Sequence, residues 1–292
     1  MTMKVLITGM GGFLGRHLAR RLIADGHAVH GVSRSPLDIE GAEIVLGDVL
    51  DRKLMEDACS GMDAVIHLAA ITEFGSISRH PAKSMETSLL GTLYALGGFV
   101  KAGGKHFIFP SSGKAYGKPA NLPIPERHSL NPETYLGHIK KLCEDLVIFY
   151  ASFTPQLYTS LRIFNVYGPG QKAYFLIPTI LSQLDKGEII LGDIKSRRDY
   201  VHVEDVVGAF RVALSRKGHG FEAYNVGSGL SSSAQDVVDE ISRIAKKECT
   251  IKTDASRLRA HEAFEERADI SKLKALGWSP RYTLVKGLSE ML

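Results

Sequence analysis

The sequence has few cysteines and no long apolar run. Its 292 residues include three cysteines, Cys59, Cys143 and Cys249, which lie far apart and form no metal-binding or redox motif. The 11 histidines show no zinc-type spacing, so no metal site is expected. No apolar stretch approaches the ~18 residues that a membrane-spanning helix requires. These absences argue against redox-motif, zinc-dependent and transmembrane proteins.

An excess of charge of one sign is also missing. The chain has 36 Lys and Arg against 32 Asp and Glu, and the basic residues are scattered. The densest basic group, Lys195–Arg198, is too small for a nucleic-acid footprint, so no nucleic-acid partner is expected. The weak positive surplus is compatible with a small anionic ligand. The first residues are apolar but interrupted by glycine and have no small-residue cleavage site, so we expect a cytoplasmic protein.

What the sequence does contain is an alternation of short apolar runs with amphipathic segments. The apolar runs predict strands at residues 4–9, 27–33, 42–48, 63–70, 105–112 and 158–168. Between the first two, Phe13–Asp25 has the periodicity of an amphipathic helix. This alternation favours an α/β fold, a doubly wound parallel sheet of the Rossmann type.

The alternation weakens from about Gly170 onward, where prolines and glycines become frequent. We therefore predict a dinucleotide-binding domain over residues 1–169 and a smaller α/β domain over residues 170–292. Parts of residues 199–227 are expected to return to the first domain.

A glycine-rich loop follows the first predicted strand. The segment "TGMGGFLG" places Gly9, Gly12 and Gly15 between that strand and a helix that begins near Phe13 and Leu14. The first glycine allows the turn, the second admits a pyrophosphate close to the backbone, and the third lets the helix pack on the strand. The helix N-terminus then faces the phosphates. The loop predicts a dinucleotide site.

The end of the second predicted strand indicates which dinucleotide binds. An acidic residue at this place usually bonds the adenosine ribose, but here Ser33 and Arg34 occupy it. An acid would repel a 2′-phosphate, whereas Ser and Arg can bind one. We therefore predict that NADP is favoured over NAD, the alternative being a plain surface loop. Asp48, after the third strand, is either an adenine contact or a simple loop acid.

Several motifs together carry a family resemblance. In chain order they are "TGMGGFLG", "GDVLD", "VIHLAA", "FPSSGKAYG", "RIFNVYGPGQ", "RRDYVHVEDVV", "YNVGSG" and "ADISKLKALGW". From Lys4 to about Gly287, the chain resembles the extended short-chain dehydrogenase/reductases, the NAD(P)-dependent nucleotide-sugar epimerase/dehydratase family. The resemblance implies a Rossmann domain, a C-terminal domain that binds a nucleotide-sugar substrate, and a homodimer of the kind common in the family.

The resemblance also assigns roles around the cofactor. Ser112 would bond the sugar oxygen that is oxidised, and Lys140 would hold the nicotinamide ribose and lower the pKa of the catalytic base. The family chemistry removes a proton from a sugar hydroxyl while a hydride passes to the nicotinamide. The cofactor-binding residues so indicated are Gly9, Gly12, Phe13, Leu14, Gly15, Ser33, Arg34, Asp48, Val49, Leu68, Ala69, Ala70 and Lys140.

The expected catalytic tyrosine is out of register. Leu136 stands four residues before Lys140, where a tyrosine would share the lysine's helix face, and Tyr135 stands five before it. We interpret Tyr135 as lying at a junction between loop and helix, where its side chain can turn toward Ser112. The alternative is that Tyr135 only packs at the helix entry and the base is missing.

On the substrate side, the resemblance makes Arg198 and Arg259 ligands of a diphosphate and Glu262 a ligand of the nucleotide ribose. Two planar bidentate donors suit a group with several anionic oxygens. Asn165 would bond the substrate phosphate or sugar. The simpler alternatives are solvated surface arginines and a turn-capping asparagine.

Departures from the family pattern shape the functional hypotheses. Gly113 and Lys114 replace the Asp-Glu pair of the 4,6-dehydratases, so dehydration is not expected, and Ser88 replaces an asparagine that supports the proton relay. The leading hypothesis is an epimerase-type oxidoreductase acting at C4 of a UDP- or dTDP-sugar. The alternatives are an NADPH-dependent 4-ketosugar reductase and a catalytically silent dinucleotide-binding sensor or scaffold.

Overall fold

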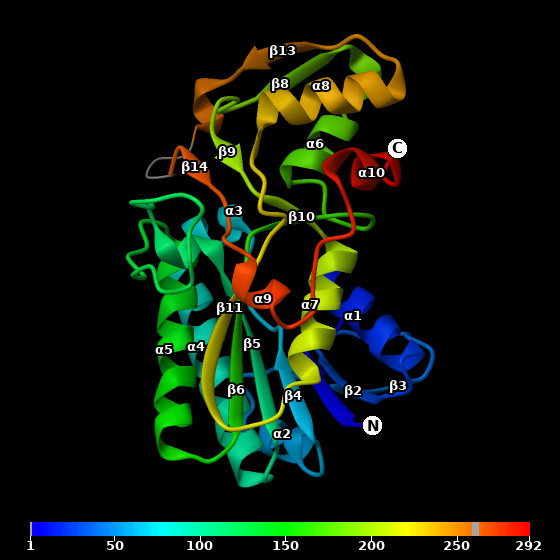
Figure 1. Ribbon diagram of the computed structural model, residues 1–292. Helices are drawn as coiled ribbons and strands as arrows, with labels where there is room; N and C mark the ends of the chain where they lie inside the picture. The colour runs from blue at the N-terminus through cyan, green and yellow to red at the C-terminus, as the bar shows by residue number, and fades with distance from the viewer. Residues whose placement is uncertain (1, 259–262) are drawn as a thin grey trace.

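The computed structural model describes residues 2–258 and 263–292. Its main feature is a seven-stranded sheet in the order β11-β6-β5-β4-β1-β2-β3, in which every neighbouring pair is parallel (Figure 1). The strands are β1 (Lys4–Thr8), β2 (Ala28–Ser33), β3 (Ala42–Leu46), β4 (Ala64–His67), β5 (His106–Ser112), β6 (Leu157–Ile163) and β11 (Gly220–Val226). The predicted Rossmann sheet is confirmed.

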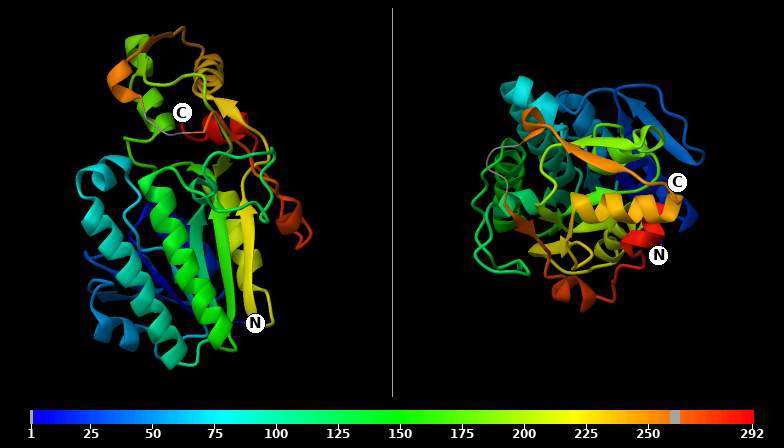
Figure 2. Two further views of the ribbon diagram at one scale, coloured as in Figure 1. Left: turned by 90° about the vertical axis from the view of Figure 1, so that its left-hand side faces the viewer. Right: turned by 90° about the horizontal axis from the view of Figure 1, so that it is seen from above.

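Helices cover both faces of this sheet. Helices α1 (Phe13–Ala24) and α7 (Val203–Leu214) pack together on one face. Helices α2 (Arg52–Cys59), α4 (Pro81–Lys101) and α5 (Tyr135–Phe153) cover the other, as Figure 2 shows for α4 and α5. The strands are therefore rich in apolar residues, although β6 and β11 also bury the polar side chains of Ser160, Arg162 and Asn225.

The burial of β1 shows how one strand serves both layers. Val5 and Ile7 belong to the core under α1 and α7, whereas Leu6 belongs to the core under α2, α4 and α5. Successive side chains of a strand point to opposite faces, so a strand covered on both sides needs apolar residues throughout. Helix α1 ends where Gly26 adopts a φ of 85°, a left-handed conformation suited to glycine.

The remaining elements lie mostly above the carboxyl ends of the strands (Figure 1). They form three small sheets: β10-β7, β12-β9-β14 and β13-β8. Their bounds are α3 (Phe74–Arg79), η1 (Gly113–Tyr116), β7 (Asn165–Tyr167), α6 (Leu176–Leu181), η2 (Leu184–Lys186), β8 (Glu188–Leu191), β9 (Arg197–Arg198), β10 (Tyr200–His202), β12 (Ser232–Ser233), α8 (Ala234–Ala245), β13 (Thr250–Thr253), η3 (Ala255–Arg257), β14 (Glu265–Glu266), α9 (Ser271–Lys274) and α10 (Leu284–Ser289).

One predicted element was wrong in detail. The run 158–168 is not a single strand, because β6 ends at Ile163 and β7 begins at Asn165 to pair with β10 in another sheet. The chain leaves the main sheet at Phe164 and later returns to it: helix α7 packs on the sheet and β11 is its edge strand. The boundary between the two domains stays a prediction. No helix of the described residues is long and apolar enough to cross a bilayer.

Candidate active site

The glycine loop brings β1 and α1 into close contact. Gly9 has a φ of 68°, and a Cβ atom there would lie 2.8 Å from the backbone nitrogen of Ala69. A Cβ on Gly15 would lie 2.6 Å from the carbonyl oxygens of both Gly9 and Met10. Because neither position has room for a side chain, glycine is needed at both.

The start of α1 fits a dinucleotide phosphate. Gly12 is its N-cap, and within the described residues no side chain caps the first-turn amides. Phe13 and Leu14 are half-buried at this turn. Free first-turn amides and the positive end of the helix dipole favour an anion at this place. The loop can therefore hold a pyrophosphate.

The ends of β2 and β3 lie beside the loop. The Ser33 hydroxyl donates to the Ser35 carbonyl at 2.8 Å and would lie 3.4 Å from a Cβ atom on Gly11. Arg34 is exposed next to it. Asp48 accepts the Leu50 amide at 3.0 Å, as the simple loop-acid reading allows.

The segment after β4, residues 68–70, packs against the end of β1 and the glycine loop. The Leu68 amide donates to the Thr8 carbonyl at 3.2 Å, and the Ala69 amide donates to the Thr8 hydroxyl at 3.2 Å. That hydroxyl also lies 2.8 Å from Nδ1 of His67. Burial lowers the pKa of His67 to about 3, and the nearby positive charge of Lys140 adds to the effect, so this imidazole is neutral.

Ala70 and Val49 are two other predicted cofactor contacts. Ala70 is half-buried after Ala69, and Val49 is buried at the end of the β3 segment. A Cβ atom on Gly91 of α4 would lie 2.9 Å from Cγ2 of Val49, so α4 packs directly on this valine. Val49 therefore helps to set how closely α4 approaches the sheet.

The carboxyl end of β5 brings Ser112 and Lys140 together. The Ser112 hydroxyl accepts the Lys114 amide at 3.1 Å, while Nζ of Lys140 donates to the Pro110 carbonyl at 2.6 Å. Lys140 is 6% exposed, and burial lowers the pKa of its ammonium from 10.5 to about 8. A lysine and a hydroxyl thus lie at the same end of one strand.

The start of α5 settles where Tyr135 lies. Thr134 caps the helix by accepting the Gly137 amide at 3.2 Å, and Tyr135 is the first helical residue, 56% exposed. Leu136 is half-buried and packs on the core beneath α5. A Cβ atom on Gly137 would lie 2.3 Å from the Lys114 carbonyl oxygen, so α5 presses directly on η1. Tyr135 thus begins the regular helix, with Thr134 as the flanking loop residue, and its catalytic role stays a prediction.

On the substrate side, Arg198 is buried on β9, with Nε 3.8 Å from the Glu266 carboxylate. Nζ of Lys114 lies 2.9 Å from the other oxygen of the same carboxylate. One buried acid, 4% exposed, thus joins η1 to the segment that carries Arg198. The backbone N–H of Asn165 donates to the Asp199 carbonyl at 3.0 Å, and its side-chain nitrogen donates to the same carbonyl at 3.4 Å. Arg259 and Glu262, both predicted substrate ligands, lie outside the described residues.

Glu266 was missed from the sequence, and the burial of Glu144 was not predicted, because nothing in their local pattern distinguishes a buried acid from a surface one. Ser88, the replaced asparagine, is 2% exposed, and its hydroxyl has no hydrogen-bond partner in the described part of the chain. Its carbonyl accepts from Thr92 at 2.7 Å.

Among residues 2–258 and 263–292, no group of His, Cys, Asp or Glu could hold a metal ion.

The strand order reverses between β4 and β1. The glycine loop follows β1, and Ser112 and Lys140 lie at the carboxyl end of β5, on the other side of β4 in the same parallel sheet. These features define a Rossmann-type protein of the extended short-chain dehydrogenase/reductase class. Within that class, the chain belongs to the NAD dependent epimerase/dehydratase family, whose model matches residues 5–227.

The known relatives extend over nearly the whole chain. A GDP-6-deoxy-D-mannose reductase from Pseudomonas aeruginosa is 31% identical, covering 100% of this chain and 97% of its own length. The structure of UDP-glucose 4-epimerase from Thermotoga maritima with UDP-glucose is 31% identical with a TM-score of 0.89, and covers 99% of this chain and 97% of its own. MoeE5 in complex with UDP-glucuronic acid and NAD is 27% identical with a TM-score of 0.92 and the same coverage.

Proposed function

We propose that the protein is an NAD(P)-dependent nucleotide-sugar oxidoreductase of the epimerase type, acting at C4 of a UDP- or dTDP-sugar. The observation that carries this proposal is that the glycine loop, Ser112 and buried Lys140 all lie at the carboxyl ends of strands of one parallel sheet. When bound, the nicotinamide supplies hydride acceptance and return. Ser112 holds the reacting sugar hydroxyl, and the Lys140 cation holds the nicotinamide ribose and favours the ionised form of a nearby base.

Tyr135 is the proposed base. It is the first helical residue of α5 and stands five before Lys140, so its direction from the helix axis differs from that of the lysine by about 140°; its exposed side chain would reach Ser112 by a change of rotamer. Leu136 cannot take this role, because its side chain is apolar and packs into the core. The single base would remove the proton from the hydroxyl held by Ser112.

The diphosphate is proposed to bind at Arg198, with Arg259 as a second donor and Glu262 on the nucleotide ribose. Two observations support this arrangement: the Glu266 carboxylate lies 3.8 Å from Nε of Arg198, and Nη1 of Arg198 donates to the Arg197 carbonyl at 2.9 Å. A pre-oriented guanidinium loses less entropy on binding. Asn165 begins β7, two positions after the end of β6, and is proposed to contact the substrate phosphate or sugar.

The second candidate is a 4-ketosugar reductase that uses NADPH. The pair Ser33–Arg34 favours it, because a cation and a hydroxyl beside the glycine loop suit the 2′-phosphate of NADP, and net reduction needs an exchangeable cofactor. Dehydration is disfavoured, since Gly113 and Lys114 stand where the dehydratases have acids. A silent sensor or scaffold, suggested by Leu136 and Ser88, is the third candidate.

A homodimer through α4 and α5 is also proposed. Along α5, Phe149 is 58% exposed and Phe153 is 74% exposed, with ring centroids 4.9 Å apart, and Leu142 and Ile148 are also exposed. Apolar side chains grouped on one helix favour burial against another protein surface. Sedimentation of the unmodified protein and of Phe149→Glu should give a dimer and a monomer; a monomer in both would contradict this.

The test of function uses the complete protein with each cofactor. UDP-glucose, UDP-galactose and their dTDP counterparts are incubated with it, and the products are separated by chromatography. Interconversion of C4 epimers supports the leading proposal. Oxidation of NADPH by a 4-keto nucleotide sugar, without epimerisation, supports the reductase. Binding of both ligands without any turnover would leave only the sensor.

A further inference from the structure

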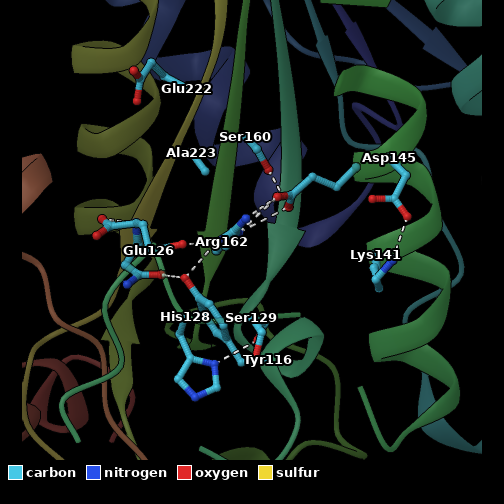
Figure 3. Close-up of polar contacts among 12 residues, drawn as sticks. Tyr116, Glu126, His128, Ser129, Lys141, Asp145, Ser160, Arg162, Glu222 and Ala223 are labelled. Atoms are coloured by element: carbon cyan, nitrogen blue, oxygen red, sulfur yellow. Dashed lines mark hydrogen bonds and ion pairs between the residues drawn. The ribbon is translucent and has the colours of Figure 1, made fainter. Parts of the chain in front are cut away.

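A buried cluster of polar side chains lies between the two elements that carry Ser112 and Lys140. Its centre is Arg162 on β6, which is 6% exposed. Figure 3 shows its guanidinium extending between α5 on one side and the segment of Tyr116 and Glu126 on the other. A guanidinium is planar and its donors have fixed directions, so its partners are held at fixed positions relative to each other.

On one side, Arg162 binds α5. Its Nε donates to Glu144 at 3.0 Å and its Nη2 donates to the same carboxylate at 2.5 Å. The Ser160 hydroxyl donates to the second oxygen of that carboxylate at 2.9 Å. Glu144 is fully buried and stands one helical turn after Lys140. The ion pair therefore attaches the lysine-bearing part of α5 to β6.

On the other side, Arg162 binds η1. Its Nη1 donates to the Tyr116 hydroxyl at 3.0 Å and to the Glu126 carbonyl at 2.7 Å. The Tyr116 hydroxyl in turn donates to the Asn225 side chain on β11 at 2.7 Å. Tyr116 is fully buried and ends η1, the short helix that begins directly after Ser112.

We propose that the guanidinium of Arg162, with Glu144 and Tyr116, is a positioning unit that fixes the distance between Lys140 and Ser112. This inference rests on the proposed function for its catalytic consequence. All three residues are buried. They act by holding the ends of two elements, and a displacement of about 1 Å at reacting groups can lower a rate by about a hundredfold.

The burial of the ion pair supports a role beyond stability. Two charges removed from water are expensive, and a well-packed apolar pair often gives equal or greater stability. What an apolar pair cannot do is bind two elements in fixed directions at once. Arg162 does so with three nitrogens, and its cation also lies 5.1 Å from the centre of the Tyr116 ring.

The first experiment is the substitution Tyr116→Phe, which removes one hydroxyl and leaves the ion pair of Arg162 and Glu144 intact. The expected result is a fall in kcat of about tenfold to a hundredfold, with KM for the nucleotide sugar and Kd for the cofactor little changed. The matched control is Asp145→Asn. Asp145 neighbours Glu144 on α5 but pairs with Lys141 at the surface, at 2.8 Å (Figure 3), and should leave kcat unchanged.

A second measurement reads the positioning without turnover. Amide hydrogen exchange should be faster in residues 112–117 and 135–141 of both Tyr116→Phe and Glu144→Gln than in the unmodified protein, and unchanged in Asp145→Asn. If the unmodified protein has no turnover, the proposed function fails while exchange still tests the inference. Unchanged exchange in both segments of Tyr116→Phe, or an unchanged kcat in an active enzyme, would overturn it.

Discussion

The pKa of Lys140 gives a quantitative prediction about stability. Burial lowers this pKa from 10.5 to about 8, a change of about 2.5 units. Since each unit corresponds to about 1.4 kcal/mol, keeping the ammonium charged inside the folded protein costs about 3 kcal/mol at neutral pH. Lys140→Met removes the charge and should remove this cost, at the expense of the 2.6 Å hydrogen bond to the Pro110 carbonyl.

The sign of the pH dependence follows from the lowered pKa. Between pH 8 and 10.5 the unfolded chain carries a proton at this lysine that the folded chain lacks, so the free energy of unfolding rises with pH in this window. Below pH 8 both states are protonated and the full cost remains. Lys140→Met has no such titration. Its stability advantage over the unmodified protein should therefore be about 3 kcal/mol larger below pH 8 than above pH 10.5.

Urea unfolding at several pH values between 7 and 10.5 measures this difference. The hydrogen bond to Pro110, a charge-assisted contact of about 1.5–3 kcal/mol, shifts the absolute values but changes the pH dependence little. The matched control is Lys141→Met, because Lys141 is the next residue on α5 and pairs with Asp145 at the surface. This variant should keep the pH dependence of the unmodified protein. If the free energies of unfolding of Lys140→Met and of the unmodified protein differ by the same amount at every pH, the reasoning is refuted.

Three further predictions concern binding and turnover. Arg34→Ala should reduce the preference for NADP over NAD by about tenfold or more, since a charge-assisted hydrogen bond contributes about 1.5–3 kcal/mol; equal affinities of the unmodified protein for both cofactors, measured by calorimetry, would rule this out. Arg198→Ala should raise the Kd for the nucleotide sugar and leave the Kd for the cofactor nearly unchanged. An unchanged Kd for the nucleotide sugar would mean that the diphosphate binds elsewhere. Tyr135→Phe should abolish turnover but leave the binding of cofactor and nucleotide sugar unchanged, and Leu136→Tyr is tested for an increase in turnover. Full turnover in Tyr135→Phe would mean that the tyrosine is only structural.

Much of the fold could be predicted from the sequence because its signals are local. A strand buried on both faces needs mostly apolar residues, and β1 and β5 contain them in the short runs Val5–Ile7 and Phe107–Pro110. Gly9 and Gly15 could be predicted for a similar reason, since a loop this tight excludes a Cβ atom at both positions.

The remaining features depend on contacts between distant parts of the chain. The run that contains Phe164 reads as one strand, but the chain changes sheets at this residue, and only the position of β10 determines that. Lys114 and Glu266 meet across 152 positions, and Glu144 and Arg162 pair between a helix and a strand. No periodicity reports such pairs, because a charged residue that is buried with a partner resembles one that is solvated.

The position of β11 at the outer edge of the sheet has a consequence for biosynthesis. Its neighbour β6 ends at Ile163, and the chain must continue to Gly220 before β11 can pair with it along all seven residues. Until then, a growing polypeptide presents β6 as an unpaired edge, which is a template for association with other chains. Chains truncated within residues 164–219 should therefore be prone to aggregation, and chaperone demand should fall once β11 has emerged from the ribosome.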